Sequence, residues 1–218
     1  MTTELLQARD AALEARVAAL YDSRLPYHNF DHVQDTLRAA QAIVRHCTAE
    51  HIRIDGEVVY YALLLHDAGY QDDHRALGYR SKEAYSAALA ETLLGEFGVS
   101  PAKVRKTVAA ILATERDGEF ITAEQKAVRA ADLSGMAADY PEFLRKSLRL
   151  KREHELLHGA PVSWRAWQET SREVLEHYLT QEIRLTSYFH NAAGESAFHA
   201  AVRANLDRLL AEPHEPAS

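Results

Sequence analysis

One run of eight apolar residues constrains the fold more than any other feature of this chain. It covers Val58–Leu65 and leads directly into His66 and Asp67. A helix that is apolar on all sides has to be buried. Ending it with an imidazole and a carboxylate is costly unless something compensates them, and a bound cation would compensate both. An Asp at a helix end and a His bonded to a backbone carbonyl would explain the pair equally well without an ion.

Signals for the start of a helix recur along the rest of the chain, as expected for a series of helices. It has few glycines and prolines and no alternating strand pattern. Helix-start signals recur at Asn29, Asp55, Ser100-Pro101, Thr122 with Gln125, and Ser163. A last helical segment is expected from about residue 195 to 210. These signals predict an all-α chain, a single-domain bundle of roughly eight to ten helices.

Composition narrows the classes of function. The net charge of −7 and the single short basic cluster, at 145–152, disfavour binding of duplex nucleic acid. The longest apolar run is too short to cross a bilayer, so no membrane association is expected. The first 17 residues carry acids and no apolar core, which predicts no signal peptide. A single cysteine, Cys47, suits a reducing compartment. The expected location is therefore the cytoplasm.

Two further segments supply potential metal ligands. In the segment PYHNFDHV, His28 and His32 surround a helix start, and a second apolar helical stretch ends near Asp132. Together with His66 and Asp67, this gives two imidazoles and two carboxylates. Such a set suits a borderline divalent ion such as Mn, Fe, Co, Ni or Zn better than it suits Mg. Four protein ligands leave one or two positions for water, as in catalytic sites.

The order His32, His66-Asp67, Asp132 resembles the HD superfamily of metal-dependent phosphohydrolases. The resemblance is greatest to one branch of the superfamily, whose first motif is Tyr-His-Asn followed by a His three residues after the Asn. Further motifs that carry it are the following: Tyr27–His32, Leu64–Tyr70, Glu83 with Ser86-Ala87, Ile111–Thr114, Ala131–Leu133 and Arg203–Leu206. The resemblance runs from about residue 20 to 210. It therefore implies one HD domain over 1–218 with its core in that range.

The resemblance implies a fold, a cofactor and a reaction. The cofactor is one divalent ion (Mn, Fe, Co, Ni, Zn or Mg) held by His32, His66, Asp67 and Asp132. The reaction is hydrolysis of a phosphomonoester, with a nucleotide as the leading candidate, by attack of metal-bound water. Many relatives have a His soon after the motif at 111–114, where this chain continues with Glu115. The lack of extra histidines there argues for one metal and leaves open whether activity is complete.

Candidate roles follow for the nearby side chains. Asp67 and Glu83 are the catalytic candidates, with Glu83 as an acid or base beside the metal. His28, Arg75, Arg80 and Lys82 are candidates for holding a small phosphorylated metabolite or nucleotide. A solvated helix residue at 83, a packing role for His28 and an ordinary charged loop would explain the same residues.

Two other functions compete with hydrolysis of a phosphoester. The segment His154-Glu155-Leu156-Leu157-His158 matches H-E-x-x-H, the zinc-protease pattern. Three features count against a protease. The residues before the segment are charged, the sequence at 159–161 ends the helix at once, and no edge strand is predicted that could hold a peptide substrate. The second alternative is a non-catalytic HD module that binds a nucleotide or metal and regulates something else. The paired Trp164 and Trp167 are assigned to the core or to a dimer face, which leaves a homodimer open.

Overall fold

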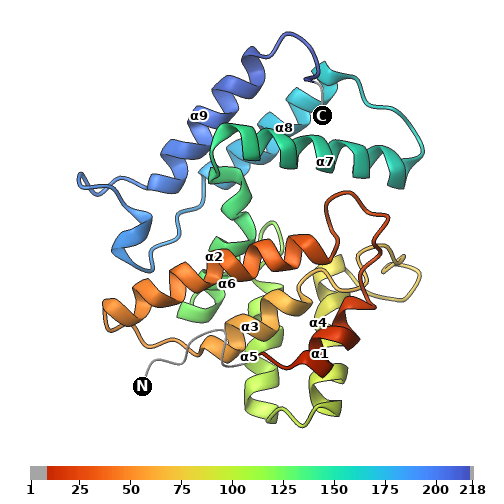
Figure 1. Ribbon diagram of the computed structural model, residues 1–218, viewed down its shortest axis with the longest axis vertical. Coiled ribbons are helices and arrows are strands. Elements are labelled where there is room, and N and C mark those ends of the chain that lie inside the picture. The colour runs from red at the N-terminus through yellow and green to blue at the C-terminus, as the bar shows by residue number, and fades with distance from the viewer. Residues whose placement is uncertain (1–8, 217–218) are drawn as a thin grey trace. The chain divides into compact units, whose positions relative to one another are not determined.

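The computed structural model describes residues 9–216, and these residues form an all-α protein, as the sequence predicts (Figure 1). The chain divides into two compact units, Met1–Asp132 and Leu133–Ser218. The first contains six α-helices: α1 (Ala11–Ala18), α2 (Phe30–Ala49), α3 (Gly56–Leu65), α4 (Lys82–Glu96), α5 (Pro101–Leu112) and α6 (Ala123–Asp132). The second contains η2 (Leu133–Ala137), α7 (Tyr140–His158), α8 (Trp164–Leu179), η3 (Ser187–Phe189) and α9 (Ala197–Ala211).

Three helices of the first unit, α2, α3 and α6, start at the capping residues that the sequence predicts. The Asn29 side chain accepts hydrogen bonds from the amides of Asp31 and His32, and so begins α2. Asp55 begins α3 in the same way. At α6, Thr122 and Gln125 form the reciprocal capping box, with side-chain to backbone distances of 3.3 and 2.9 Å. Each cap satisfies amides that the first helical turn leaves without a partner.

Helix α3 is the core of the first unit. It packs against α1, α2, α4, α5 and α6. Every residue of the apolar run Val58–Leu65 is buried except Tyr61, which is half-buried. Burying a large apolar side chain stabilises the fold by about 1.5–3 kcal/mol. The run therefore fixes the position of α3, and with it the position of His66 and Asp67 at its end.

The second unit has a core of its own. Six buried residues form it: Tyr140, Phe143, Leu175, Val202, Leu206 and Leu209. Asn205, from the Arg-x-Asn-Leu motif, donates from its amide nitrogen to the carbonyls of Met136 and Ala138, both at 2.9 Å. The motif thereby fastens η2 to α9. The single domain over 1–218 stays a prediction.

Along residues 9–216, no helix combines the length and apolar character needed to cross a membrane. Residues 1–8, part of the segment in which the sequence predicts no signal peptide, lie outside the described residues.

Candidate metal centre

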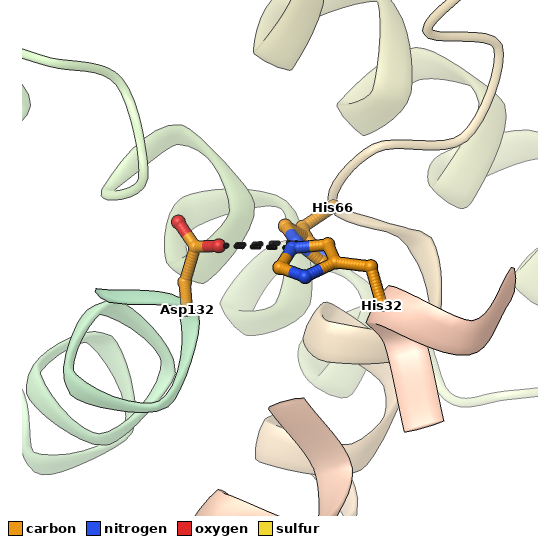
Figure 2. Close-up of side chains that lie close together, drawn as sticks. All are labelled: His32, His66 and Asp132. Atoms are coloured by element: carbon orange, nitrogen blue, oxygen red, sulfur yellow. Dashed lines mark hydrogen bonds and ion pairs between the residues drawn. The ribbon is translucent and has the colours of Figure 1, made fainter. Parts of the chain in front are cut away.

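His32 is placed by the start of α2. It lies in the first helical turn behind the Asn29 cap, and it is almost fully buried. Its ring packs on Tyr27, with centroids 4.6 Å apart. Among the described residues its Nδ1 has no hydrogen-bond partner. The ring is therefore oriented by packing, and its Nε2 faces the other members of the site (Figure 2).

His66 and Asp67 follow the last residue of α3. The Nδ1 of His66 lies 2.9 Å from the carbonyl oxygen of Leu63, which can only accept, so Nδ1 carries a hydrogen. A neutral His66 then presents the lone pair of Nε2 to the site, as a metal ligand must. Two residues beyond Asp67, Gly69 turns the chain with φ +73°, where an added Cβ would lie 2.5 Å from the Tyr85 ring. Glycine is thus required to make this turn.

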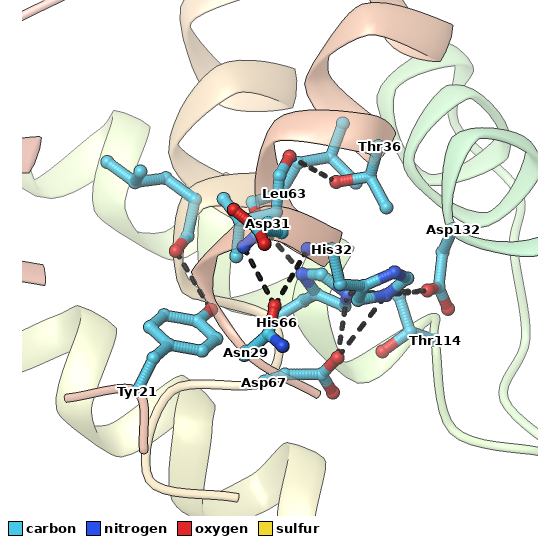
Figure 3. A network of polar contacts seen from close by, with 12 residues as sticks. Tyr21, Asn29, Asp31, His32, Thr36, Leu63, His66, Asp67, Thr114 and Asp132 are labelled. Carbon is cyan, nitrogen blue, oxygen red and sulfur yellow. Dashed lines mark hydrogen bonds and ion pairs between the residues drawn. The ribbon is translucent and has the colours of Figure 1, made fainter. Parts of the chain in front are cut away.

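Asp132 is the last residue of α6, and it completes a compact set of donor atoms (Figures 2 and 3). The two Nε2 atoms of His32 and His66 lie 3.3 Å apart. Asp132 Oδ1 lies 3.5 Å from the first and 3.3 Å from the second. Asp67 Oδ2 lies 3.6 and 3.0 Å from the same two atoms. Three helices and one turn therefore bring all four predicted ligands together.

These separations fit one metal ion. Two ligand atoms, each about 2.1 Å from an ion, lie about 3.0 Å apart at a right angle and about 3.4 Å apart at a tetrahedral angle. The three separations among His32, His66 and Asp132, 3.3 to 3.5 Å, lie close to the tetrahedral value. Two imidazoles with two carboxylates also form a chemically suitable set for a borderline divalent ion. In the described part of the chain, His32, His66 and Asp132 form the one group of three or more potential ligands that could hold a metal. Asp67, the fourth predicted ligand, lies beside the two imidazoles but outside this group.

The electrostatics of the site also call for a cation. Burial lowers the pKa of His32. Burial acts in the same direction on His66, but Asp67 and Asp132 outweigh it and hold the pKa of His66 well above its ordinary value. Burial would raise the pKa of Asp67, yet His66, His28 and His32 lower it to about 2. Burial would likewise raise the pKa of Asp132, but His32 and His66 lower it. The site thus favours two ionised carboxylates beside a protonated His66, and a metal ion that binds there has to displace the His66 proton.

Glu83 and Glu115 are close enough for their charges to interact. Burial, together with the negative charges of Asp67 and Glu115, raises the pKa of the Glu83 carboxyl. Glu115 accepts a 2.7 Å hydrogen bond from Ser81, the N-cap of α4. It also pairs with Arg80 at 2.9 Å. Glu115 is therefore engaged by the start of α4, the helix that carries Glu83.

The four predicted substrate contacts differ in their surroundings. His28 stacks on Tyr70, with centroids 3.7 Å apart, and its ring lies 5.8 Å from that of His32. Lys82 lies over Tyr70 as well. Arg75 is exposed, and Arg80, which pairs with Glu115, keeps 69% of its side chain exposed. His28 is thus beside the metal centre, whereas substrate binding by any of the four stays a prediction.

The H-E-x-x-H segment has other partners at the end of α7. The rings of His154 and His158 stack on each other at 4.1 Å, and His158 Nδ1 lies 2.9 Å from the His154 carbonyl. Glu155 binds Lys151 at 2.7 Å and the amide of Val162 at 2.8 Å. No group that could hold a metal includes these histidines in the described residues. This arrangement gives the protease alternative no support.

Replacing His154 and His158 with alanine should leave the metal content of the protein unchanged. Both side chains are exposed and distant in sequence from the four ligands, and surface substitutions of this kind usually change stability by less than about 0.5 kcal/mol. Metal analysis of the two variants after identical loading would check this. Loss of bound metal from either variant would revive the protease hypothesis.

Two residues near the site were not singled out from the sequence. Tyr70 is the last residue of the Leu64–Tyr70 motif, and its place in that motif is the only feature of the sequence that could have pointed to a role at the site. Arg129 lies one turn before Asp132 on α6, and just 1% of it is exposed. Its guanidinium donates to the carbonyls of Ala113, Glu115 and Arg116. It therefore fastens the loop after α5, which carries Glu115, to the helix that ends in Asp132.

Comparison with protein-family models and with curated proteins found no match for this chain.

Proposed function

We propose that this chain is an HD-type, metal-dependent phosphohydrolase that cleaves a phosphomonoester, with nucleotides as the first substrates to test. One observation carries the proposal: the Nε2 atoms of His32 and His66 lie 3.3 Å apart, and each lies 3.0 to 3.6 Å from a carboxylate oxygen of Asp67 and of Asp132. We also propose that it acts in the cytoplasm, the reducing compartment that suits its single, buried Cys47.

The residues divide the chemistry among them. A divalent ion, when bound, supplies a water of lowered pKa and polarises a phosphoryl oxygen. His66 and Asp67 would hold that ion at the end of α3, where the packing of a buried helix fixes the position of their backbone. Glu83 is suited to accept and release a proton, because burial raises the pKa of its carboxyl toward the working pH. His32 and His66 are buried, whereas the Asp67 and Asp132 side chains keep 15% and 20% of their surface exposed, so a substrate would approach from the side of the carboxylates.

The decisive experiment is an assay of phosphate release from a panel of nucleotides and other phosphomonoesters. The protein would be loaded in turn with Mn, Fe, Co, Ni, Zn or Mg. We expect release with at least one ion and none after chelation. Glu83→Gln should keep the metal and lose most of the turnover, by about 10²–10⁴-fold. If every loaded form releases phosphate from nothing in the panel, the non-catalytic regulatory module becomes the better hypothesis.

A further inference from the structure

Beside the metal centre, the ring of Tyr70 is covered on both faces. The His28 imidazole is parallel to it within 12°, at a centroid distance of 3.7 Å. The Lys82 ammonium lies 3.6 Å from the same centroid. Both cannot occupy one face at these distances, so they lie on opposite faces. Lys82 also donates a hydrogen bond to the Tyr70 carbonyl. We call this arrangement the His28–Tyr70–Lys82 stack.

The stack is built from the segments that carry the metal ligands and Glu83. His28 precedes His32 by one helical turn, and their rings meet edge to face at 5.8 Å. The Tyr70 amide donates to the Asp67 carbonyl at 3.1 Å, so Asp67 and Tyr70 share one turn. Lys82 is the first residue of α4, directly before Glu83. The stack therefore joins the segment before α2, the turn after α3 and the start of α4.

The charge of the site shows why a stack of this kind is needed. The charges of a divalent ion and of the two carboxylates, Asp67 and Asp132, sum to zero. The chain as a whole carries −7, and its field repels an anion. A phosphomonoester dianion thus needs positive charge that comes from neither the metal nor the overall field. Lys82 brings a fixed positive charge to the segment that carries Glu83, and His28 brings a ring N–H beside His32.

We propose that His28 and Lys82 bind the phosphoryl group of a dianionic phosphomonoester at the metal centre, and that Tyr70 is the residue that positions them. This inference rests on the proposed function for the identity of the substrate. It makes the site selective for a monoester over a diester, because a diester carries one negative charge fewer and gains less from Lys82.

Binding of inorganic phosphate to the cobalt-loaded protein tests the proposal without requiring turnover. The readout is the change in the cobalt absorption spectrum as phosphate is added. We expect Lys82→Met and His28→Asn each to weaken phosphate binding by about tenfold, and cobalt affinity to stay within about twofold. Lys106→Met is the matched control, because Lys106 is an exposed lysine of α5 in the same unit. It should bind phosphate like the wild type.

Two further comparisons separate positioning from direct contact. Tyr70→Phe keeps the ring between His28 and Lys82 and should bind phosphate normally, whereas Tyr70→Leu should lose about as much affinity as Lys82→Met. Dimethyl phosphate, a monoanion, should bind more weakly than phosphate to the wild type, and Lys82→Met should narrow that difference.

Unchanged phosphate affinity in both Lys82→Met and His28→Asn, with cobalt still bound, would overturn the proposal. So would a failure of the cobalt-loaded wild type to bind phosphate at all. If phosphate binds through the stack but no ester is hydrolysed, the stack stands and the proposed enzyme activity fails.

Discussion

Replacing Asp67 with asparagine should lower the affinity for the divalent ion by about a hundredfold or more and remove metal-dependent turnover. Asparagine keeps the shape of the side chain but loses the charge that lies 3.0 Å from His66 Nε2. Four-ligand zinc sites bind with apparent free energies of about 10–16 kcal/mol, which is about 2.5–4 kcal/mol for each ligand. One lost ligand thus corresponds to about 10²–10³-fold in affinity.

A competition titration against a chromogenic chelator measures this loss directly. Asp31→Asn is the matched control, because it removes the same charge from an exposed position next to His32. That variant should bind the ion as tightly as the wild type does. Equal affinities for Asp67→Asn and the wild type would show that the ion binds elsewhere, and the assignment of the metal centre would be wrong.

The helices could be predicted from the sequence because their signals are local. Asn29 and Asp55 cap helices with their own side chains, so a few neighbouring residues specify each start. The apolar run at 58–65 likewise required a buried helix whatever surrounded it. Ser100 shows the limit of such signals. Helix α5 starts at Pro101 as predicted, but the Ser100 side chain makes no capping hydrogen bond, and the proline alone marks the boundary.

The metal ligands could be predicted only in part from their own positions. Each lies near a helix end, and a buried carboxylate there calls for compensation. Their convergence depends on the packing of α2, α3 and α6, which local patterns do not specify, and the resemblance to HD proteins supplied that step. The structure groups three of the four predicted ligands, His32, His66 and Asp132, closely enough for one ion, and the role of Asp67 as a fourth stays a prediction.

The residues that the sequence did not reveal act through contacts between distant segments. Tyr70 meets His28 across 42 positions of the chain, and nothing around either residue indicates a stack. Arg129 occupies an ordinary position in a helix of mixed polarity, where an arginine is usually solvated. Its three carbonyl partners lie 13 to 16 residues earlier, in a loop whose path is set by tertiary structure.

The buried guanidinium of Arg129 leads to the second large prediction. Arg129→Met should reduce the free energy of unfolding by about 2–4 kcal/mol. Methionine fills much of the space of the arginine stem but donates no hydrogen bond. The carbonyls of Ala113, Glu115 and Arg116 would then lose their charged donor, and hydrogen bonds to charged groups contribute about 1.5–3 kcal/mol each. Removing a buried charge offsets part of that loss, because desolvating a guanidinium is costly.

Urea denaturation of Arg129→Met and Arg105→Met would measure the effect against a matched control. Arg105 is exposed on α5, so its replacement should change stability by less than about 0.5 kcal/mol. The free energy of unfolding of Arg129→Lys should lie between those of Arg129→Met and Arg105→Met, because an ammonium reaches fewer carbonyls than a guanidinium does. If Arg129→Met were as stable as the control, the three bonds would contribute nothing net. The loop that holds Glu115 against Ser81 would then owe its position to backbone packing alone, including the tight turn at Gly118, where an added Cβ would lie 2.7 Å from the Leu112 carbonyl oxygen.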